Sequence, residues 1–288
     1  MPANLLRALK NIASYGNNDL GVYFARSARS QVRINVAGEK LEFFVKDAFC
    51  DCFNLPLQDK ERKYSEVFSW SGNQNNPPDA ILRNGDAFEI KKMDKLKNAI
   101  QLNSSPPKDK CYSNDSRMVQ ATRDCEDQKW TEKDLFYVVG ATPKERIKYL
   151  FFVQGTCYAA KREVYERIEK PLKKGIEDRI KVNGIEGGNE TNELGRINRV
   201  DPLGITNLRI RGMWTIQNPI QVFEYVYKFN ERQNFSLTAL MLKSKFDSYP
   251  TEDIKALNQA KIKVVPAKIK DPNNRAKWLD AQLITSGW

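Results

Sequence analysis

The sequence predicts an α/β fold in which a central mixed β-sheet is flanked by helices. Two near-continuous runs of apolar and β-branched residues, Leu135–Ala141 and Tyr149–Thr156, are typical of central strands that are buried on both faces. Segments with helical spacing lie before and after these runs, and strands that alternate with helices are the pattern of an α/β domain. With 288 residues, 41% of them hydrophobic, the chain can bury a substantial core.

The N-terminal part is expected to be mainly helical. Residues 1–36 predict one helix followed by a polar connection. From Gly38 to Phe53 the apolar residues recur at spacings of three and four, which predicts a helix, and Glu42 falls outside its apolar face. Residues 54–78 are mixed and end in a predicted polar loop, Ser71–Pro78.

Beyond residue 78 the elements are predicted from apolar spacing and from turn-forming residues. They are a β-hairpin (Ala80–Arg83 and Asp86–Met93), a loop with two prolines (Asn103–Asp115), a charged helix (Ala159–Ile180), a Gly- and Asn-rich mobile loop (residues 181–204) and a strand (Leu208–Ile216). The tail from Tyr249 is basic and less patterned. It predicts no definite element.

The absence of histidine restricts the chemistry most. Without imidazole there can be no Ser-His-Asp triad, no Cys-His pair and no His-dependent metal hydrolase. Hydrolysis by this chain would have to use carboxylates, lysine and a hard cation such as Mg²⁺. The cysteines contain no C-x-x-C pair, so we expect reduced thiols and no structural zinc site.

The charge balance points to a polyanionic partner. Lys and Arg outnumber Asp and Glu by 47 to 36, a net charge of +11, which is typical of nucleic-acid-binding proteins. A basic protein without such a partner is the alternative. We find no apolar run that predicts a signal peptide or a membrane helix. The expectation is therefore a cytoplasmic protein with no membrane partner.

An acidic and basic constellation lies on the predicted hairpin. Glu89 and Lys91 share one face of its second strand. A two-residue turn at Asn84-Gly85 would place Asp79 opposite Ile90, on the other face. A three-residue loop with Gly85 in the left-handed conformation places Asp79 across from Glu89. We expect the second geometry because it brings chemically matched groups together.

Opposed carboxylates repel each other across a hairpin unless a cation lies between them. With Mg²⁺ there, Asp79 and Glu89 would become its ligands, together with the Ile90 carbonyl. Lys91, beside a cation and an apolar wall, is expected to have a lowered pKa and to orient or deprotonate the attacking water. Glu42 could reach the same metal or a second one. The alternative is that these residues form solvated pairs on an exposed strand.

Pro78-Asp79 and Glu89-Ile90-Lys91 fill the motif of the PD-(D/E)xK nucleases, which the sequence resembles. Longer stretches are similar to the NgoPII-like type II restriction endonucleases, over roughly residues 1–240. These stretches are Gly72–Asp79, Leu102–Lys108, Trp130–Asp134, Gly195–Thr206 and Leu208–Trp214.

The resemblance implies a restriction-endonuclease-like core in a bacterial homodimer that has one Mg²⁺ site in each subunit and no small-molecule cofactor. Such an enzyme cuts both strands of a short palindrome in double-stranded DNA, here a GC-rich site of the GGCC kind. By the family motif, Asp79 and Glu89 are metal ligands and Lys91 is the catalytic lysine. Glu42 is also carried over as catalytic, although the helical glutamate varies in position among these nucleases.

The resemblance also divides the chain. The expected parts are an endonuclease domain (residues 1–242), its catalytic core (about 38–160) and DNA-recognition part (about 195–230), and a C-terminal extension of unassigned role (243–288).

Several basic and amide side chains are candidate DNA contacts. Arg209 and Arg211 share one face of the predicted strand, with Leu208 and Ile210 anchoring the other, and suit bidentate reading of guanine. Contacts to phosphate, or a solvated edge strand, are the alternatives. The remaining candidates are Asn73, Gln74, Asn75, Asn76, Lys108, Arg117 and Arg123, which can also be read as polar turn residues or solvated charges.

Two other functions remain open at this point. A repair or recombination nuclease of the same fold would share the site but would cut without sequence specificity. A DNA-binding protein would keep the carboxylates only as structural groups. A requirement for a divalent metal separates a nuclease from a binding protein.

Overall fold

The computed structural model describes residues 2–27, 37–73, 76–182, 193–203 and 205–288. Its helices are α1 (Leu5–Tyr15), α2 (Leu20–Ser27), α3 (Ala37–Cys50), α4 (Leu57–Val67), α5 (Gln120–Arg123), α6 (Gly155–Tyr158), α7 (Arg162–Val182), α8 (Pro219–Val222), α9 (Lys243–Asp247) and α10 (Thr251–Gln259). Its strands are β1 (Phe68–Asn73), β2 (Asn76–Leu82), β3 (Ala87–Met93), β4 (Ile100–Asn103), β5 (Lys110–Tyr112), β6 (Glu132–Ala141), β7 (Tyr149–Gln154), β8 (Gly195–Ile197), β9 (Leu208–Ile210), β10 (Trp214–Ile216), β11 (Ser236–Leu242), β12 (Lys263–Asp271) and β13 (Asn274–Gly287).

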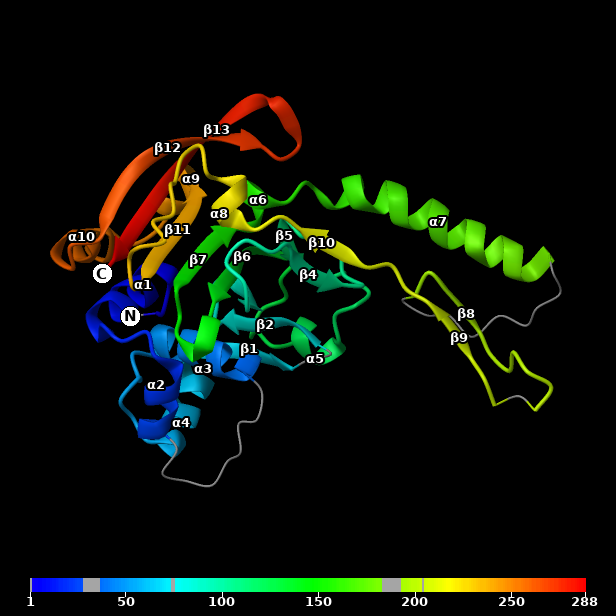
Figure 1. Ribbon diagram of the computed structural model, residues 1–288, viewed down its shortest axis with the longest axis horizontal. Coiled ribbons are helices and arrows are strands. Elements are labelled where there is room, and N and C mark those ends of the chain that lie inside the picture. The colour runs from blue at the N-terminus through cyan, green and yellow to red at the C-terminus, as the bar shows by residue number, and fades with distance from the viewer. Residues whose placement is uncertain (1, 28–36, 74–75, 183–192, 204) are drawn as a thin grey trace.

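The predicted central mixed sheet is confirmed. Its strands follow the order β1-β2-β3-β6-β7-β11-β13-β12 (Figure 1). β3 and β6 are parallel, as are β7 and β11, whereas the other neighbours in this order are antiparallel. The two predicted central strands are β6 and β7. β7 is buried along its whole length, and β6 is buried from Leu135 onward.

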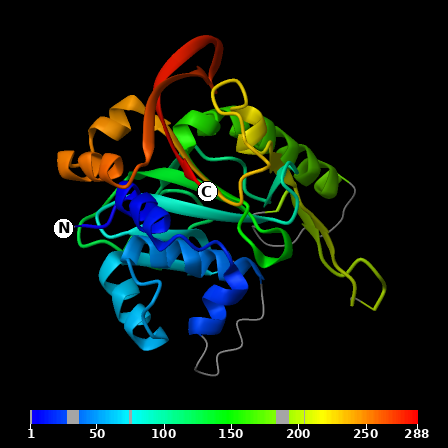
Figure 2. The same ribbon diagram turned by 60° about the vertical axis from the view of Figure 1, so that its left-hand side comes forward.

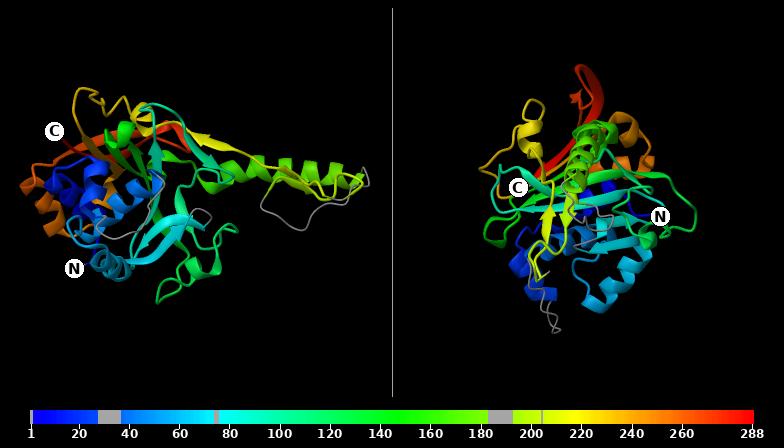
Figure 3. Two further views of the ribbon diagram at one scale, coloured as in Figure 1. Left: turned by 60° about the horizontal axis from the view of Figure 1, so that its bottom comes forward. Right: turned by 90° about the vertical axis from the view of Figure 1, so that its right-hand side faces the viewer.

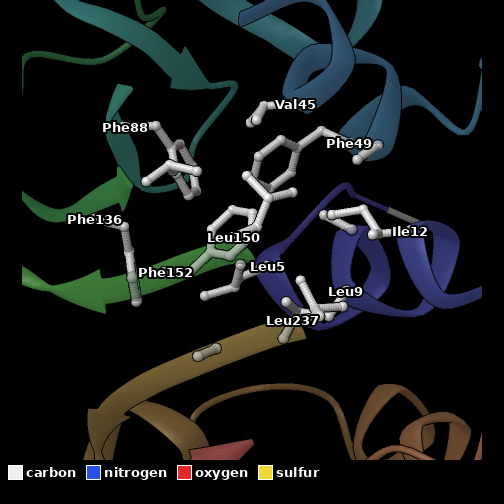
Figure 4. Packing of buried hydrophobic residues seen from close by; sticks show 14 of the residues in the cluster. Leu5, Leu9, Ile12, Val45, Phe49, Phe88, Phe136, Leu150, Phe152 and Leu237 are labelled. Atoms are coloured by element: carbon white, nitrogen blue, oxygen red, sulfur yellow. The ribbon is translucent and has the colours of Figure 1, made fainter. Parts of the chain in front are cut away.

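Alternate residues of the central strands face two separate hydrophobic cores, because side chains of a strand point to opposite faces in turn. Phe136 of β6 lies in the core that contains α1 and α3, and its neighbour Tyr137 lies in the core that contains α6 and α8. The N-terminal helices gather on one side of the sheet (Figure 2). In that first core, Phe49 of α3 packs on Phe88 of β3 with ring centroids 4.5 Å apart (Figure 4).

The C-terminal tail is part of the central sheet. β13 pairs with β11 from Ser236↔Gly287 to Leu242↔Ala281, and β12 pairs with β13 beyond it. The expected boundary at residue 242 lies at the end of β11, and the strands that follow it continue the same sheet. The apolar alternation of the tail is weak since β12, at the end of the strand order, is buried mainly at Ile269.

Other expectations about elements were also wrong. Residues 2–27, the part of the expected N-terminal segment that the structure describes, contain two helices, α1 and α2, instead of one. The predicted polar loop Ser71–Pro78 belongs largely to the strands β1 and β2, which pair antiparallel. The predicted strand Leu208–Ile216 is two short strands in different sheets. In each case polar residues lie within strands or between elements, and there the spacing of apolar residues predicts the secondary structure poorly.

α7 and the β8–β9 hairpin project from the sheet as one arm (Figure 3). A Cβ on Gly195 would lie 2.5 Å from Ile176 of α7, so glycine permits this close approach of hairpin and helix. Of the predicted mobile loop, residues 183–192 and 204 lie outside the described residues. None of the helices in the described ranges is long and apolar enough to cross a membrane.

Candidate active site

The β2–β3 hairpin places Asp79 and Glu89 face to face. Ala80 pairs with Phe88, and the Leu82 N–H donates to the Asp86 carbonyl at 2.9 Å, which leaves a three-residue loop between the strands. Continuing this register by one residue sets Asp79 across from Glu89. The predicted loop length is therefore confirmed.

The backbone of this loop differs in one detail from the expectation. Asn84 has the positive φ, 55°, whereas Gly85 is not among the described glycines with positive φ. Asparagine adopts this left-handed conformation more readily than most residues. The Glu126 carboxylate accepts a hydrogen bond from the Asn84 N–H at 3.0 Å, which fixes the loop from outside the hairpin.

Burial and a facing charge disfavour the ionised form of Asp79. Asp79 Oδ2 accepts a hydrogen bond from the Ile90 N–H at 2.6 Å. Nevertheless, burial and the nearby Glu89 carboxylate raise the pKa of Asp79 to about 7. The positive charge next to this pair of carboxylates therefore compensates their two negative charges only in part.

Lys91 supplies part of the missing positive charge. Its Nζ lies 2.6 Å from Glu89 Oε1. Burial would lower the pKa of Lys91, but Glu89 and Asp79 outweigh burial and raise it above its ordinary value. The lowered pKa was expected beside a bound cation, whereas in the metal-free protein two carboxylates stabilise the ammonium. Lys91 is a charged hydrogen-bond donor here.

Glu42 lies on α3 near the same site. Its Oε1 is 2.6 Å from Lys46 Nζ one turn further along the helix. The Glu42 charge acts on the pKa values of both Asp79 and Lys91, raising each. Among the described residues, no three Cys, Asp or Glu side chains converge closely enough to hold a metal ion. Glu42 is therefore a neighbour of the carboxylate pair and does not complete an acid triad.

The donor set fits a hard divalent cation. Asp79 and Glu89 offer oxygen donors from facing positions, and hard cations such as Mg²⁺ prefer carboxylate, carbonyl and water ligands. A cation between them would remove the repulsion that raises the pKa of Asp79.

These residues open into a cleft of about 780 Å³. The cleft lining contains Asp79, Glu89 and Lys91 together with four of the predicted DNA contacts. Those four are Lys108, Arg117, Arg209 and Arg211. Segments about 120 residues apart in the sequence thus meet at one site, which only the tertiary fold can bring about.

Lys108 and Arg117 are tied to one carboxylate at the edge of the cleft. Asp115 Oδ2 lies 3.0 Å from Lys108 Nζ, and its Oδ1 lies 3.1 Å from Arg117 Nε. Although burial raises it, the pKa of Asp115 falls below its ordinary value because of these two cations. Arg123 donates to the Asp115 carbonyl at 3.0 Å and is not part of the cleft lining. Its predicted DNA contact is thus not brought to the site.

Glu193 is a cleft residue that the sequence did not predict. Its Oε1 lies 2.6 Å from the Nε atoms of both Arg209 and Arg211. No local signal could have found it, because it precedes those arginines by 16 and 18 residues and meets them only through the β8–β9 hairpin. Leu208 is 48% exposed, so its predicted anchoring role is wrong.

The amide run before Asp79 is only partly described. Asn73 ends β1 and pairs with Asn76 at the start of β2. Gln74 and Asn75 lie outside the described residues. Asn76 is partly buried and is not part of the cleft lining. The positions of Asn73 and Asn76 in these paired strands therefore give no support to a DNA contact by either residue.

The chain is similar to proteins of one known family. A family model described as NgoPII restriction endonuclease matches residues 3–271. The chain is 43% identical over 284 residues to a protein of Neisseria gonorrhoeae named Type II restriction enzyme NgoPII. The matched region covers 98% of this chain and 99% of that protein. No solved structure matches the chain. The similarity extends well beyond residue 240, so the tail is not an addition to the family pattern.

Proposed function

Because the chain belongs to the NgoPII restriction endonuclease family, we propose that it hydrolyses phosphodiester bonds in both strands of a short palindromic site in double-stranded DNA. We propose a GC-rich site of the GGCC kind. The main support is that Asp79, Glu89 and Lys91 share one cleft with two half-exposed arginines, Arg209 and Arg211. Acidic groups for the chemistry and basic groups for the DNA thus lie together.

Asp79 and Glu89 would hold Mg²⁺ through their carboxylates, with the Ile90 carbonyl as a further ligand. In such a site the ion stabilises the negative charge that builds on the phosphate during hydrolysis. The Ile90 N–H fixes one oxygen of Asp79, so the Asp79 carboxylate is already oriented before DNA binds. This pre-orientation reduces the reorganisation needed in the transition state.

Lys91 would act as a cation in the reaction. Its ammonium group would donate a hydrogen bond to the attacking water or to a phosphate oxygen, and in the metal-free protein Glu89 and Asp79 raise the pKa of Lys91. Glu42 would not bind the metal and would act as a nearby negative charge that favours the protonated state of Lys91. Lys46 holds Glu42 in place through their ion pair on α3.

Arg209 and Arg211 would read the site. Arginine binds guanine O6 and N7 through two hydrogen bonds in the major groove. A palindrome presents the same base pattern to two identical subunits related by a two-fold axis. We therefore propose that a homodimer binds the site, with one set of arginines for each half.

Arg209→Ala or Arg211→Ala is expected to lower affinity for the specific site by about 10- to 100-fold, because a bidentate base contact contributes about 1–3 kcal/mol of discrimination. Affinity for random DNA should fall much less. Both affinities can be measured by gel shift with Ca²⁺ in place of Mg²⁺. Equal losses on both DNAs would show that these arginines contact phosphates and do not read bases.

The proposed function is tested by incubating a fully sequenced phage DNA with the purified protein and Mg²⁺. Discrete fragments whose ends map to one short palindrome are expected. A smear would replace the proposal with a non-specific nuclease of the same family. Uncut DNA with both Mg²⁺ and Mn²⁺ would contradict the proposal altogether.

A further inference from the structure

We infer that Glu193 is a positioning residue for base recognition, which holds the Arg209 and Arg211 guanidinium groups in a fixed orientation within the cleft. This inference rests on the proposed function of the cleft and adds a specificity-determining residue to it. Glu193 makes no proposed contact with DNA itself and acts through the two arginines.

The geometry places one carboxylate oxygen between two guanidinium groups. Glu193 Oε1 lies 2.6 Å from Nε of both Arg209 and Arg211. The Glu193 side chain is 8% exposed, whereas those of Arg209 and Arg211 are 52% and 48% exposed. The Glu193 carboxylate is therefore buried, whereas the two arginine side chains that it holds are about half exposed to solvent.

The ion pairs with Glu193 do not use the terminal nitrogens of either arginine, which are the atoms that can contact a base. A guanidinium group carries five N–H donors in a rigid fork. The ion pairs engage Nε, while the two terminal nitrogens form the edge that can contact guanine O6 and N7 together. Fixing Nε orients the plane of the group, so less side-chain freedom is lost when DNA binds.

The strand pairing brings a further positive charge close to the two arginines. Arg196 of β8 lies directly across from Arg209 of β9, and like charges in facing positions are destabilising. Arg196 Nε donates to Asn198 Oδ1 at 2.9 Å, which gives it a neutral partner. Glu193 is thus the carboxylate that offsets this cluster of positive charge on the side facing the cleft.

The alternative to positioning is competition. The Glu193 carboxylate could simply compete with DNA for the arginines, which would weaken binding to every sequence alike. The two roles differ in what Glu193→Gln does. If Glu193 positions the arginines, the variant loses discrimination between sites. If Glu193 only competes, the variant binds all DNA more tightly and discrimination stays the same.

The test measures affinity for a duplex with the mapped cleavage site and for a random duplex, with Ca²⁺ as the divalent cation. For Glu193→Gln we expect the ratio of the two affinities to fall about 10-fold, with unchanged or tighter binding to random DNA. Glu193→Asp keeps the charge but shortens the side chain by one methylene. It should lower the ratio too, while leaving the binding of random DNA and its salt dependence as in the original protein.

Glu166→Gln is the matched control. Glu166 on α7 also bridges two cations, with Oε1 2.6 Å from Arg162 Nε and Oε2 2.7 Å from Lys170 Nζ, but it is not part of the cleft lining. Its replacement removes the same charge from the protein. The affinity ratio of this variant should stay within a factor of two of the original protein.

A variant that lacks both arginines tests whether Glu193 acts through them. With both arginines changed to alanine, Glu193→Gln should have no further effect on the ratio, because coupled residues are not additive. An unchanged ratio in Glu193→Gln alone, or an equal gain on both duplexes, would overturn the inference. If the original protein itself does not discriminate between the duplexes, the proposed function fails instead.

Discussion

Asp79→Asn is expected to abolish DNA cleavage and at the same time to stabilise the metal-free protein. The variant removes one of two facing carboxylates but keeps an oxygen that can accept the Ile90 N–H hydrogen bond. We expect cleavage to fall about 10³-fold or more, since charge stabilisation at the reacting phosphate is lost. Cleavage rates on plasmid DNA measure this effect.

The stability gain should depend on pH. The folded-state pKa of Asp79, about 7, lies above its ordinary value of 3.8. Folding therefore favours the protonated form, and stability falls as pH rises through this interval. The asparagine variant lacks that loss. Its advantage should reach about 4 kcal/mol above pH 7, since each unit by which the pKa is raised corresponds to about 1.4 kcal/mol, and should disappear toward pH 4. Thermal denaturation in a chelator measures this difference.

Mg²⁺ should stabilise the original protein but not the Asp79→Asn variant. It should raise the melting temperature of the original protein, because a ligand that binds only the folded state stabilises it, and should leave Asp79→Asn nearly unchanged. Asp94→Asn is the control, since the Asp94 side chain is 85% exposed and lies just beyond β3. It should change neither cleavage nor melting temperature. Normal cleavage by Asp79→Asn would remove Asp79 from the active site.

Lys60→Met is expected to lower the free energy of unfolding by about 3–5 kcal/mol, because it leaves a buried carboxylate without its cation. Lys60 on α4 forms an ion pair with Asp47 on α3, and both side chains are almost fully buried. The Asp47 carboxylate also accepts hydrogen bonds from the hydroxyl groups of Tyr23 and Tyr64. This network connects α2, α3 and α4 on one side of the sheet.

Urea denaturation of the variants measures the cost. Lys63→Met provides the control, because Lys63 lies on the same helix and pairs with Glu66 at an exposed position. It should change stability by no more than about 0.5 kcal/mol. Adding Asp47→Asn to Lys60→Met should restore part of the loss, since the unpaired charge is then removed. A loss below about 1 kcal/mol in Lys60→Met would show that the two tyrosines and the Cys52 thiol compensate Asp47 without the lysine.

The same network bears on the active site through α3. Glu42 and Lys46 lie on this helix, five residues or fewer before Asp47. Weakening the packing of α3 is therefore expected to disturb the charge that Glu42 places near Lys91. Cleavage by Lys60→Met at a temperature where it remains folded should be lower than that of Lys63→Met.

Some of this protein could be read from its sequence because the signal is local. The two apolar runs predicted β6 and β7, since strands buried on both faces need uninterrupted apolar residues. The turn residues left two registers for the hairpin, and matching the chemistry of Asp79 to that of Glu89 selected the one that the structure has. Family similarity over most of the chain confirmed the restriction endonuclease prediction.

Other features depended on contacts between distant segments. The tail joined the central sheet because β13 found a partner in β11, and its own pattern did not require that pairing. The pKa of Lys91 is raised because two carboxylates act on it together with burial, a balance that no spacing reveals. Glu193 reached the arginines only when β8 and β9 paired.

By itself, then, the sequence determined the chemical groups and the nearby geometry: a histidine-free, basic chain with Asp79, Glu89 and Lys91 arranged on one hairpin. The tertiary structure decided which distant charges surround them, namely Glu42 from α3 and the Glu193, Arg209 and Arg211 cluster from the arm. The physical reason is range. Turn formation and apolar periodicity depend on neighbours along the chain, whereas strand pairing between distant segments and electrostatic balance depend on what folding brings close in space.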